Sequence, residues 1–154
     1  MDGDTRPEVS DFGSVDPAPP SENVDIMENQ RVLIDEEARM FLRMRAVFGL
    51  RNIGGDDGVA ALCEGLSSKS ALLKHEIAYV LGQMQNPTAL PSLEVLLADI
   101  NEHVMVRHEA AEAMGAIGKQ ESRELLERFL TDPLPEISES CEVALDLLDH
   151  RLSN

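Results

Sequence analysis

The chain has 154 residues, enough for one modest domain, and its 13 Lys and Arg against 29 Asp and Glu give a formal net charge of −16 at pH 7. This acidity argues against a nucleic-acid partner, whose phosphate backbone needs clustered Lys and Arg, and no apolar run approaches the roughly 20 residues of a membrane-spanning helix. With no Trp, one Tyr and four Phe, the core has to be aliphatic, which favours packed helices over sheets.

The first 25 residues differ in composition from the rest of the chain. They hold seven acidic residues and one Arg, and they contain the Pro-rich run VDPAPP at 15–20. A segment of this kind buries too little apolar surface to offset the entropy lost on ordering it. We therefore expect a flexible, disordered acidic tail or linker over residues 1–25 and a helical domain over residues 26–154.

The remaining residues are helical by their periodicity. Two segments, 72–84 and 104–117, each carry apolar residues at helical spacing along one face. Gly- and Pro-rich breaks separate such segments, and Asn86-Pro87 is typical of an N-cap followed by a first turn. Cys63 and Cys141 lie far apart inside helical patterns, which indicates reduced core thiols in a cytoplasmic protein. The sequence predicts about eight helices and no convincing strand.

An internal repeat organises these helices. The segment 74–78 (KHEIA) matches 107–111 (RHEAA) at an offset of 33 residues, and the same offset relates Gly82 to Gly115. Further steps of 33 forward and 31 backward reach Cys141 and Met44. Repeats of about 30 residues in a helical chain indicate stacked hairpins, each of which buries its faces against its neighbours. The predicted fold is therefore all-α, an α-solenoid of about four HEAT-like helical hairpins, in which the two glycines allow neighbouring helices to approach closely.

The two middle repeats carry His-Glu pairs at equivalent positions, His75-Glu76 and His108-Glu109. The outer repeats lack the pair, so repeat packing alone does not require it. Equivalent positions on stacked helices lie about 10 Å apart, within reach of two imidazoles that share a metal ion. Adjacent His and Glu residues point about 100° apart on a helix, so we expect that one pair does not chelate a single ion.

Two imidazoles and one carboxylate with open positions are characteristic of non-haem iron sites. Taken singly, each His or Glu has the simpler interpretation of a polar residue on a solvated helix face. We expect His103 and His150 to be surface residues, Cys141 to be buried and not metal-bound, and Tyr79 and Glu112 to serve packing more than substrate binding. By this count the chain holds half of a two-metal site.

Several segments resemble the deoxyhypusine hydroxylase family. They are VDPAPP at 15–20, SALLKHE at 70–76, YVLGQM at 79–84, MVRHEA at 105–110 and EAMGAIG at 112–118. The similarity runs from about Ser14 to His150 and implies a HEAT-repeat di-iron monooxygenase. That family has two four-repeat halves in one chain, and this sequence is similar to the C-terminal half only.

The resemblance implies a function and a set of site residues. Two Fe²⁺ ions per complete site and dioxygen would serve to hydroxylate the deoxyhypusine residue of a eukaryotic translation initiation factor. His75 and His108 would share one iron and Glu76 would reach across to the other. Glu109 would lie close by, as a further ligand or as a catalytic residue that holds the substrate amine or orients oxygen. A negative rim would attract the basic substrate.

Because the chain holds only half of a two-metal site, more than one function remains compatible with its sequence. The chain is either a hydroxylase, or its metal-binding half, or a non-catalytic HEAT scaffold that kept the motif; an incomplete gene model or fragment is compatible with each. Because the two halves of the family are related by approximate two-fold repetition, a homodimer of this chain would rebuild the whole site.

Overall fold

The computed structural model describes residues 8–153, and within that range it contains eight α-helices, four short 3₁₀-helices and no strand. The α-helices are α1 (Ile26–Ile34), α2 (Met40–Ile53), α3 (Gly55–Glu64), α4 (Ala71–Met84), α5 (Leu90–Ala98), α6 (Val104–Ile117), α7 (Arg123–Arg128) and α8 (Pro135–Leu152). The prediction of an all-α protein is confirmed. None of the helices in this range has the length and the apolar content needed to cross a membrane.

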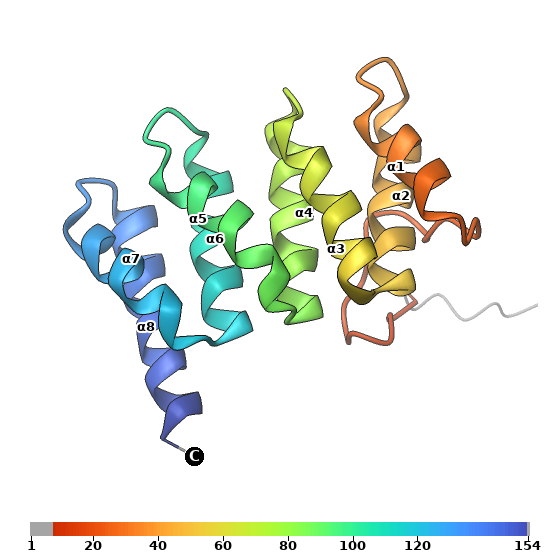
Figure 1. Cartoon of the computed structure of the whole chain (residues 1–154). Helices are drawn as coiled ribbons and strands as arrows, with labels where there is room; N and C mark the ends of the chain where they lie inside the picture. Colours follow the sequence, from red (N-terminus) through yellow and green to blue (C-terminus); the bar gives the residue numbers. More distant parts are fainter. Residues whose placement is uncertain (1–7, 154) are drawn as a thin grey trace, which may run out of the picture.

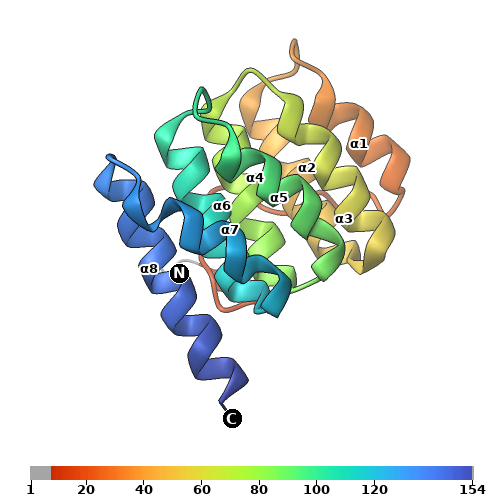
Figure 2. The same ribbon diagram turned by 60° about the vertical axis from the view of Figure 1, so that its left-hand side comes forward.

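Consecutive helices form four hairpins that stack side by side in chain order (Figure 1). Figure 2 shows α1, α3, α5 and α7 in one layer and α2, α4 and α6 behind it, with α8 continuing that second layer at the left. In that second layer α6 packs against both α4 and α8. Aliphatic side chains between the layers form one continuous core, as expected for an α-solenoid in which each hairpin is covered by its neighbours.

The two helices that carry the His-Glu pairs begin and end at capping residues. The Ser70 hydroxyl accepts a hydrogen bond from the Leu73 N–H at the start of α4, and His103 Nδ1 accepts from the Met105 N–H at the start of α6, both at 3.1 Å. Gln85 and Gly118 end α4 and α6 in the left-handed conformation, which stops a helix and satisfies its last carbonyls. These caps fix the registers of α4 and α6.

Close contacts at the two repeat-related glycines hold the second layer together. A Cβ atom at Gly82 would lie 3.1 Å from Ala113 Cα, and one at Gly115 would lie 2.9 Å from Ala144 Cα. Both distances are shorter than ordinary contacts between a Cβ and another carbon. The expectation that these glycines allow close approach is confirmed, at the contact of α4 with α6 and at the contact of α6 with α8.

Residues 10–21, called here the N-terminal strap, lie against α2 and α4. Asp16 forms an ion pair with Arg51 on α2, with two N–O distances of 2.9 and 2.7 Å, and the Gln83 amide on α4 donates to the Ser14 hydroxyl. Ala18 is only 3% exposed. The strap is thus held against the helical domain, whereas a flexible segment was expected over residues 1–25. The residues that hold it come from helices far along the chain.

The contacts of the strap do not test the other part of the expectation for residues 1–25. Residues 1–7 lie outside the described residues, and the division of the chain at residue 25 stays a prediction.

Candidate metal centre

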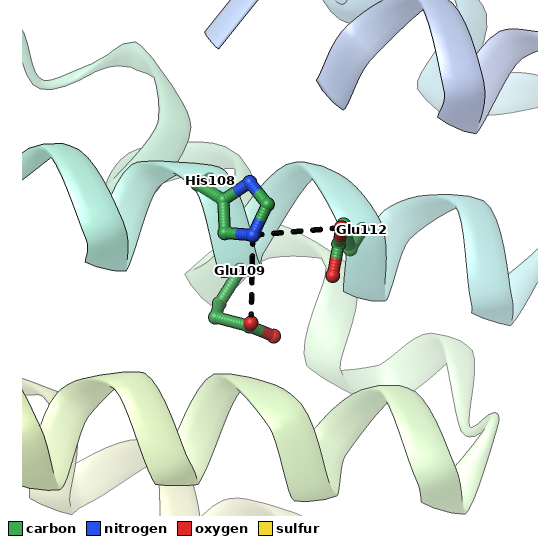
Figure 3. A group of neighbouring side chains, drawn as sticks. All are labelled: His108, Glu109 and Glu112. Atoms are coloured by element: carbon green, nitrogen blue, oxygen red, sulfur yellow. Dashed lines mark ion pairs between the residues drawn. The ribbon is translucent and has the colours of Figure 1, made fainter. Parts of the chain in front are cut away.

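The second layer brings His75 on α4 next to Glu109 and His108 on α6. Glu109 Oε1 lies 3.1 Å from His75 Nε2 and 3.7 Å from His108 Nε2. Figure 3 shows Glu109 extending from α6 toward α4, with its carboxylate below the His108 ring. The Glu109 side chain is 11% exposed and the two imidazoles are about one quarter exposed. One carboxylate therefore lies between two imidazoles at a partly open surface.

The side chains of His108 and Glu109 come closer together than their adjacent positions on the helix had suggested. The Cα–Cβ bonds of His108 and Glu109 diverge, yet their ligand atoms are 3.7 Å apart. The length of the Glu109 side chain explains this short distance, because its three rotatable bonds bring the carboxylate back beneath the imidazole. The ligand atoms of this adjacent pair are therefore close enough to approach one ion.

Glu76, predicted as a ligand, lies on a different side of His75. Its carboxylate is 3.8 Å from His75 Nδ1, whereas Glu109 is next to His75 Nε2. A metal ion bound by His75 Nε2 would thus meet Glu109 and not Glu76. The structure places all four predicted residues in one region, and within it the Glu109 carboxylate is the group that lies near both His75 and His108.

Glu112 joins this group, although its sequence position had suggested packing. Its carboxylate lies 3.5 Å from His108 Nε2 (Figure 3). Among the described residues, the ligand atoms of His108, Glu109 and Glu112 all lie within 4.8 Å of one another. The spacing of four residues between His108 and Glu112 was the available signal, since residues four apart share a helix face. Cys141, His103 and His150 are outside this group, and Cys141 is buried as expected.

The residue before each histidine anchors its helix. Lys74 Nζ contacts both Glu102 carboxylate oxygens at 2.8 Å and so ties α4 to the turn before α6. Arg107 is buried, donates from Nε to the Leu97 carbonyl at the end of α5, and pairs with Asp132 at 3.4 Å. These anchors fix the starts of α4 and α6 and thereby the places of the two imidazoles.

The second ring nitrogens of the two histidines have different surroundings. His108 Nδ1 lies 2.5 Å from the Ser140 hydroxyl on α8, and that hydroxyl donates to the Glu136 carbonyl, also at 2.5 Å. His75 Nδ1 is buried and has no hydrogen-bond partner. The two imidazoles are therefore not equivalent, and the buried Nδ1 atom of the partly exposed His75 side chain is left without a hydrogen bond.

Burial also acts on the carboxylates of the site. It raises the pKa of Glu109 above its ordinary value, against the lowering effect of the nearby His75, and the Glu112 carboxylate adds to the rise. Burial likewise raises the pKa of Glu76, opposed by His75 and reinforced by Asp16 of the strap. Carboxylates whose ionised form is disfavoured by burial gain most from a bound cation.

A groove runs along α4 and α6 beside these residues. It has a volume of about 310 Å³, and its lining includes Tyr79, Gly82 and Gln83 from α4 and Glu109 and Glu112 from α6. Gly82 and the small residues opposite it keep this stretch between the helices open. A slender ligand in the groove would lie next to the Glu109 carboxylate.

Comparison with known proteins agrees with this architecture. The family model for HEAT repeats matches residues 40–104 and 59–146. Deoxyhypusine hydroxylase-B of Oryza sativa subsp. japonica is 50% identical over 146 residues, and the human deoxyhypusine hydroxylase is 47% identical over 145 residues. In both cases the alignment covers 94% of this chain and 48% of the relative.

A solved structure gives the same result. The structure of human deoxyhypusine hydroxylase in complex with glycerol superposes with a TM-score of 0.90 at 47% identity, covering 94% of this chain and 50% of that one. The chain thus spans about half the length of the relatives that it matches. The chain belongs to the HEAT-repeat family, and over nearly its whole length it is a homologue of one half of the deoxyhypusine hydroxylases.

Proposed function

We propose that this chain is the C-terminal half of a deoxyhypusine hydroxylase, and that it serves the iron- and dioxygen-dependent hydroxylation of a deoxyhypusine side chain. The observation that carries the proposal is the Glu109 carboxylate between His75 and His108. It occurs in a chain 47% identical to a protein of that name. The half-length match is the reason why the activity is assigned to the assembled protein and not to one copy of the chain.

The donor set fits a ferrous ion. His75, His108 and Glu109 supply two imidazoles and one carboxylate, the ligand types of non-haem iron proteins. The unpartnered Nδ1 atom of His75 and the burial that disfavours an ionised Glu109, in spite of its contact with His75, both support a site that gains from a bound cation. Iron, when bound, would supply the binding and activation of dioxygen.

The remaining acidic residues would serve a cationic substrate. Deoxyhypusine is a long side chain with amine groups, and Glu76 and Glu112 offer carboxylates on two sides of the His-Glu cluster. The exposed Glu112 borders the groove along α4 and α6. Together with the net charge of −16, these residues favour the basic region of a translation initiation factor as partner.

Two copies of the chain would complete the two-iron site by pairing their second-layer faces across a two-fold axis. Each copy would bring one set of two imidazoles and a carboxylate, giving two irons per dimer. We infer a cytoplasmic location from the translation factor that serves as substrate.

Iron binding by the full chain tests the ligand assignment. Under anaerobic conditions, we expect His75→Gln, His108→Gln and Glu109→Gln each to lose bound Fe²⁺ in equilibrium dialysis. His103→Asn is the matched control, since it removes an imidazole outside the cluster and Asn is a good N-cap. Equal iron content in the His75→Gln variant and the wild type would contradict the assignment.

Hydroxylation of a deoxyhypusine-containing initiation factor tests the activity. We expect mass spectrometry to detect a gain of one oxygen atom when the iron-loaded chain forms dimers, measured in parallel by light scattering. A monomer that binds no iron and leaves the substrate unchanged would favour the scaffold interpretation instead.

A further inference from the structure

The hydrogen bonds of Ser140 determine where its single hydroxyl proton lies. Ser140 is buried on α8, and its Oγ is 2.5 Å from the Glu136 carbonyl oxygen. A carbonyl oxygen only accepts hydrogen bonds, so the proton between these two oxygens belongs to the hydroxyl. The Oγ lone pairs then face His108 Nδ1, also at 2.5 Å.

These hydrogen bonds determine the tautomer of the neutral His108 ring, that is, which of its two nitrogens carries the hydrogen. A hydroxyl that already donates its proton can only accept from His108, so His108 Nδ1 must carry the hydrogen. The Nε2 atom then holds the lone pair, and this atom is the one that lies 3.7 Å from Glu109 and 3.5 Å from Glu112. Metal-binding histidines commonly donate their other N–H to such a partner, which fixes the tautomer and the ring orientation.

The equivalent arrangement is absent at His75. One repeat back from Ser140 stands Arg107, whose Nε donates to the Leu97 carbonyl. No described hydrogen-bond partner reaches His75 Nδ1. The repeat therefore supplies a tautomer-setting hydroxyl to one of the two histidines only.

We propose that Ser140 is a positioning residue that holds His108 in the Nδ1–H tautomer, with Nε2 directed at the Glu109 and Glu112 carboxylates. His75 has no such hydroxyl at Nδ1, and its tautomer is set from the other side, where Nε2 donates to the Glu109 carboxylate at 3.1 Å. Ser140 acts through His108 and does not itself touch a metal or a substrate. The consequence for metal affinity rests on the function proposed above, whereas the tautomer does not.

Nuclear magnetic resonance of the metal-free full chain at pH 8, with ¹⁵N-labelled histidine, tests the tautomer directly. In the wild type we expect His108 as the Nδ1–H form and His75 as the Nε2–H form, because His75 Nε2 donates to Glu109. In Ser140→Ala we expect a large fraction of His108 to convert to the Nε2–H form. Ser140→Thr should restore the wild-type pattern, because a Thr hydroxyl in a helix can also bond the carbonyl four residues earlier.

Ser138→Ala is the matched control, since Ser138 lies on the same helix but on another face. Fe²⁺ affinity forms the second measurement, with an expected loss of about 10- to 100-fold in Ser140→Ala and no change in Ser138→Ala.

An unchanged His108 tautomer in Ser140→Ala would overturn the proposal. A changed tautomer with unchanged iron affinity would confirm that Ser140 sets the tautomer and refute only its consequence for the metal. A wild type that binds no iron but shows the Nδ1–H form would refute the proposed function and still support the role of Ser140 in orienting His108.

Discussion

The ion pair between Arg51 and Asp16 allows a quantitative prediction about the N-terminal strap. The Arg51 side chain is fully buried and Asp16 is 9% exposed. Arg51 also lies over the rings of Phe12 and Phe48, 4.7 and 5.1 Å from their centroids. Arg51→Met keeps most of the apolar volume and removes the charge, so Asp16 loses the cation that compensates its burial.

The size of the effect follows from this burial. Removing one partner of a buried ion pair costs about 3 to 5 kcal/mol, because the other charge stays buried without compensation. The strap can instead detach and return Asp16 to water, so the measured loss is the smaller of this cost and the free energy of strap docking. A loss of about 3 kcal/mol corresponds to a more than 100-fold rise in the population of the detached strap.

Amide hydrogen exchange at Ser21 measures that population. The Ser21 N–H donates to the Arg45 carbonyl on α2 at 2.9 Å, so its exchange reports on strap docking. We expect Ser21 to exchange more than 100-fold faster in Arg51→Met, while the amides of α6 keep their protection. Arg31→Met is the control, because Arg31 pairs with Glu28 at 2.9 Å but both side chains are largely exposed, a setting worth about 1 kcal/mol or less. Unchanged exchange at Ser21 would refute the reasoning.

The same contact has a defined pH dependence. Burial works to raise the pKa of Asp16, but hydrogen bonds from Arg51 and Ser14 outweigh it, so the pKa lies below its ordinary value. A depressed carboxyl pKa contributes stability that is present at neutral pH and lost as the pH falls through the folded-state pKa. We therefore expect acidification below about pH 4 to release the strap of the wild type, as followed by limited proteolysis with an acid-active protease.

Three further predictions concern the second layer and its thiols. Gly115→Ala should lower the free energy of unfolding, measured in urea, by about 1 kcal/mol. Overpacking against Ala144 at 2.9 Å costs about 1 to 3 kcal/mol, whereas the higher helix propensity of Ala returns at most about 1 kcal/mol. Gly82→Ala should lower the free energy of unfolding by less. Glu109→Gln should stabilise the metal-free chain at pH 7 by about 0.5 kcal/mol or more, because its raised pKa means that the ionised form opposes folding. Cys141, whose pKa burial raises to about 11, should resist alkylation at pH 8 in the native chain while the partly exposed Cys63 reacts, as measured by mass spectrometry.

The fold was predictable because its determinants are local and repeated. A helical period within each segment and the offset of 33 residues between segments predict stacked hairpins without knowledge of any long-range contact. The strap was not predictable in this way. Its composition suggests disorder, and the residues that hold it, Arg51 and Gln83, are 35 and 69 positions away from Asp16 and Ser14 respectively. Charge balance counted within a segment cannot reveal partners at that distance.

The site was predictable to the level of backbone register and no further. The registered pair His75 and His108 follows from the repeat, because equivalent positions on stacked helices are neighbours. Whether Glu76 or Glu109 lies between them depends on side-chain torsions, which the direction of a Cβ does not determine. Ser140 gave no signal at all, since the equivalent position in the preceding repeat is Arg107, with a different chemistry and a different contact.

The grouping of Glu109 with both histidines changes what a homodimer would have to provide. When a carboxylate from the other half completes each iron site, a single copy binds iron weakly and iron content follows dimerisation. When Glu109 completes the site from its own chain, each copy carries a full set of three ligands, and iron per chain stays constant as the chain is diluted. Only the enclosure of the substrate between the ligand sets of two copies then depends on dimerisation.

Dilution therefore separates the two cases. With the ligand set of His75, His108 and Glu109, we expect the iron content to remain near one per chain across the monomer–dimer transition. Hydroxylation per chain should instead fall with dilution in parallel with the dimer fraction measured by light scattering. Iron that is released together with the loss of the dimer would contradict the single-chain ligand set and restore Glu76 of the partner copy as the completing ligand.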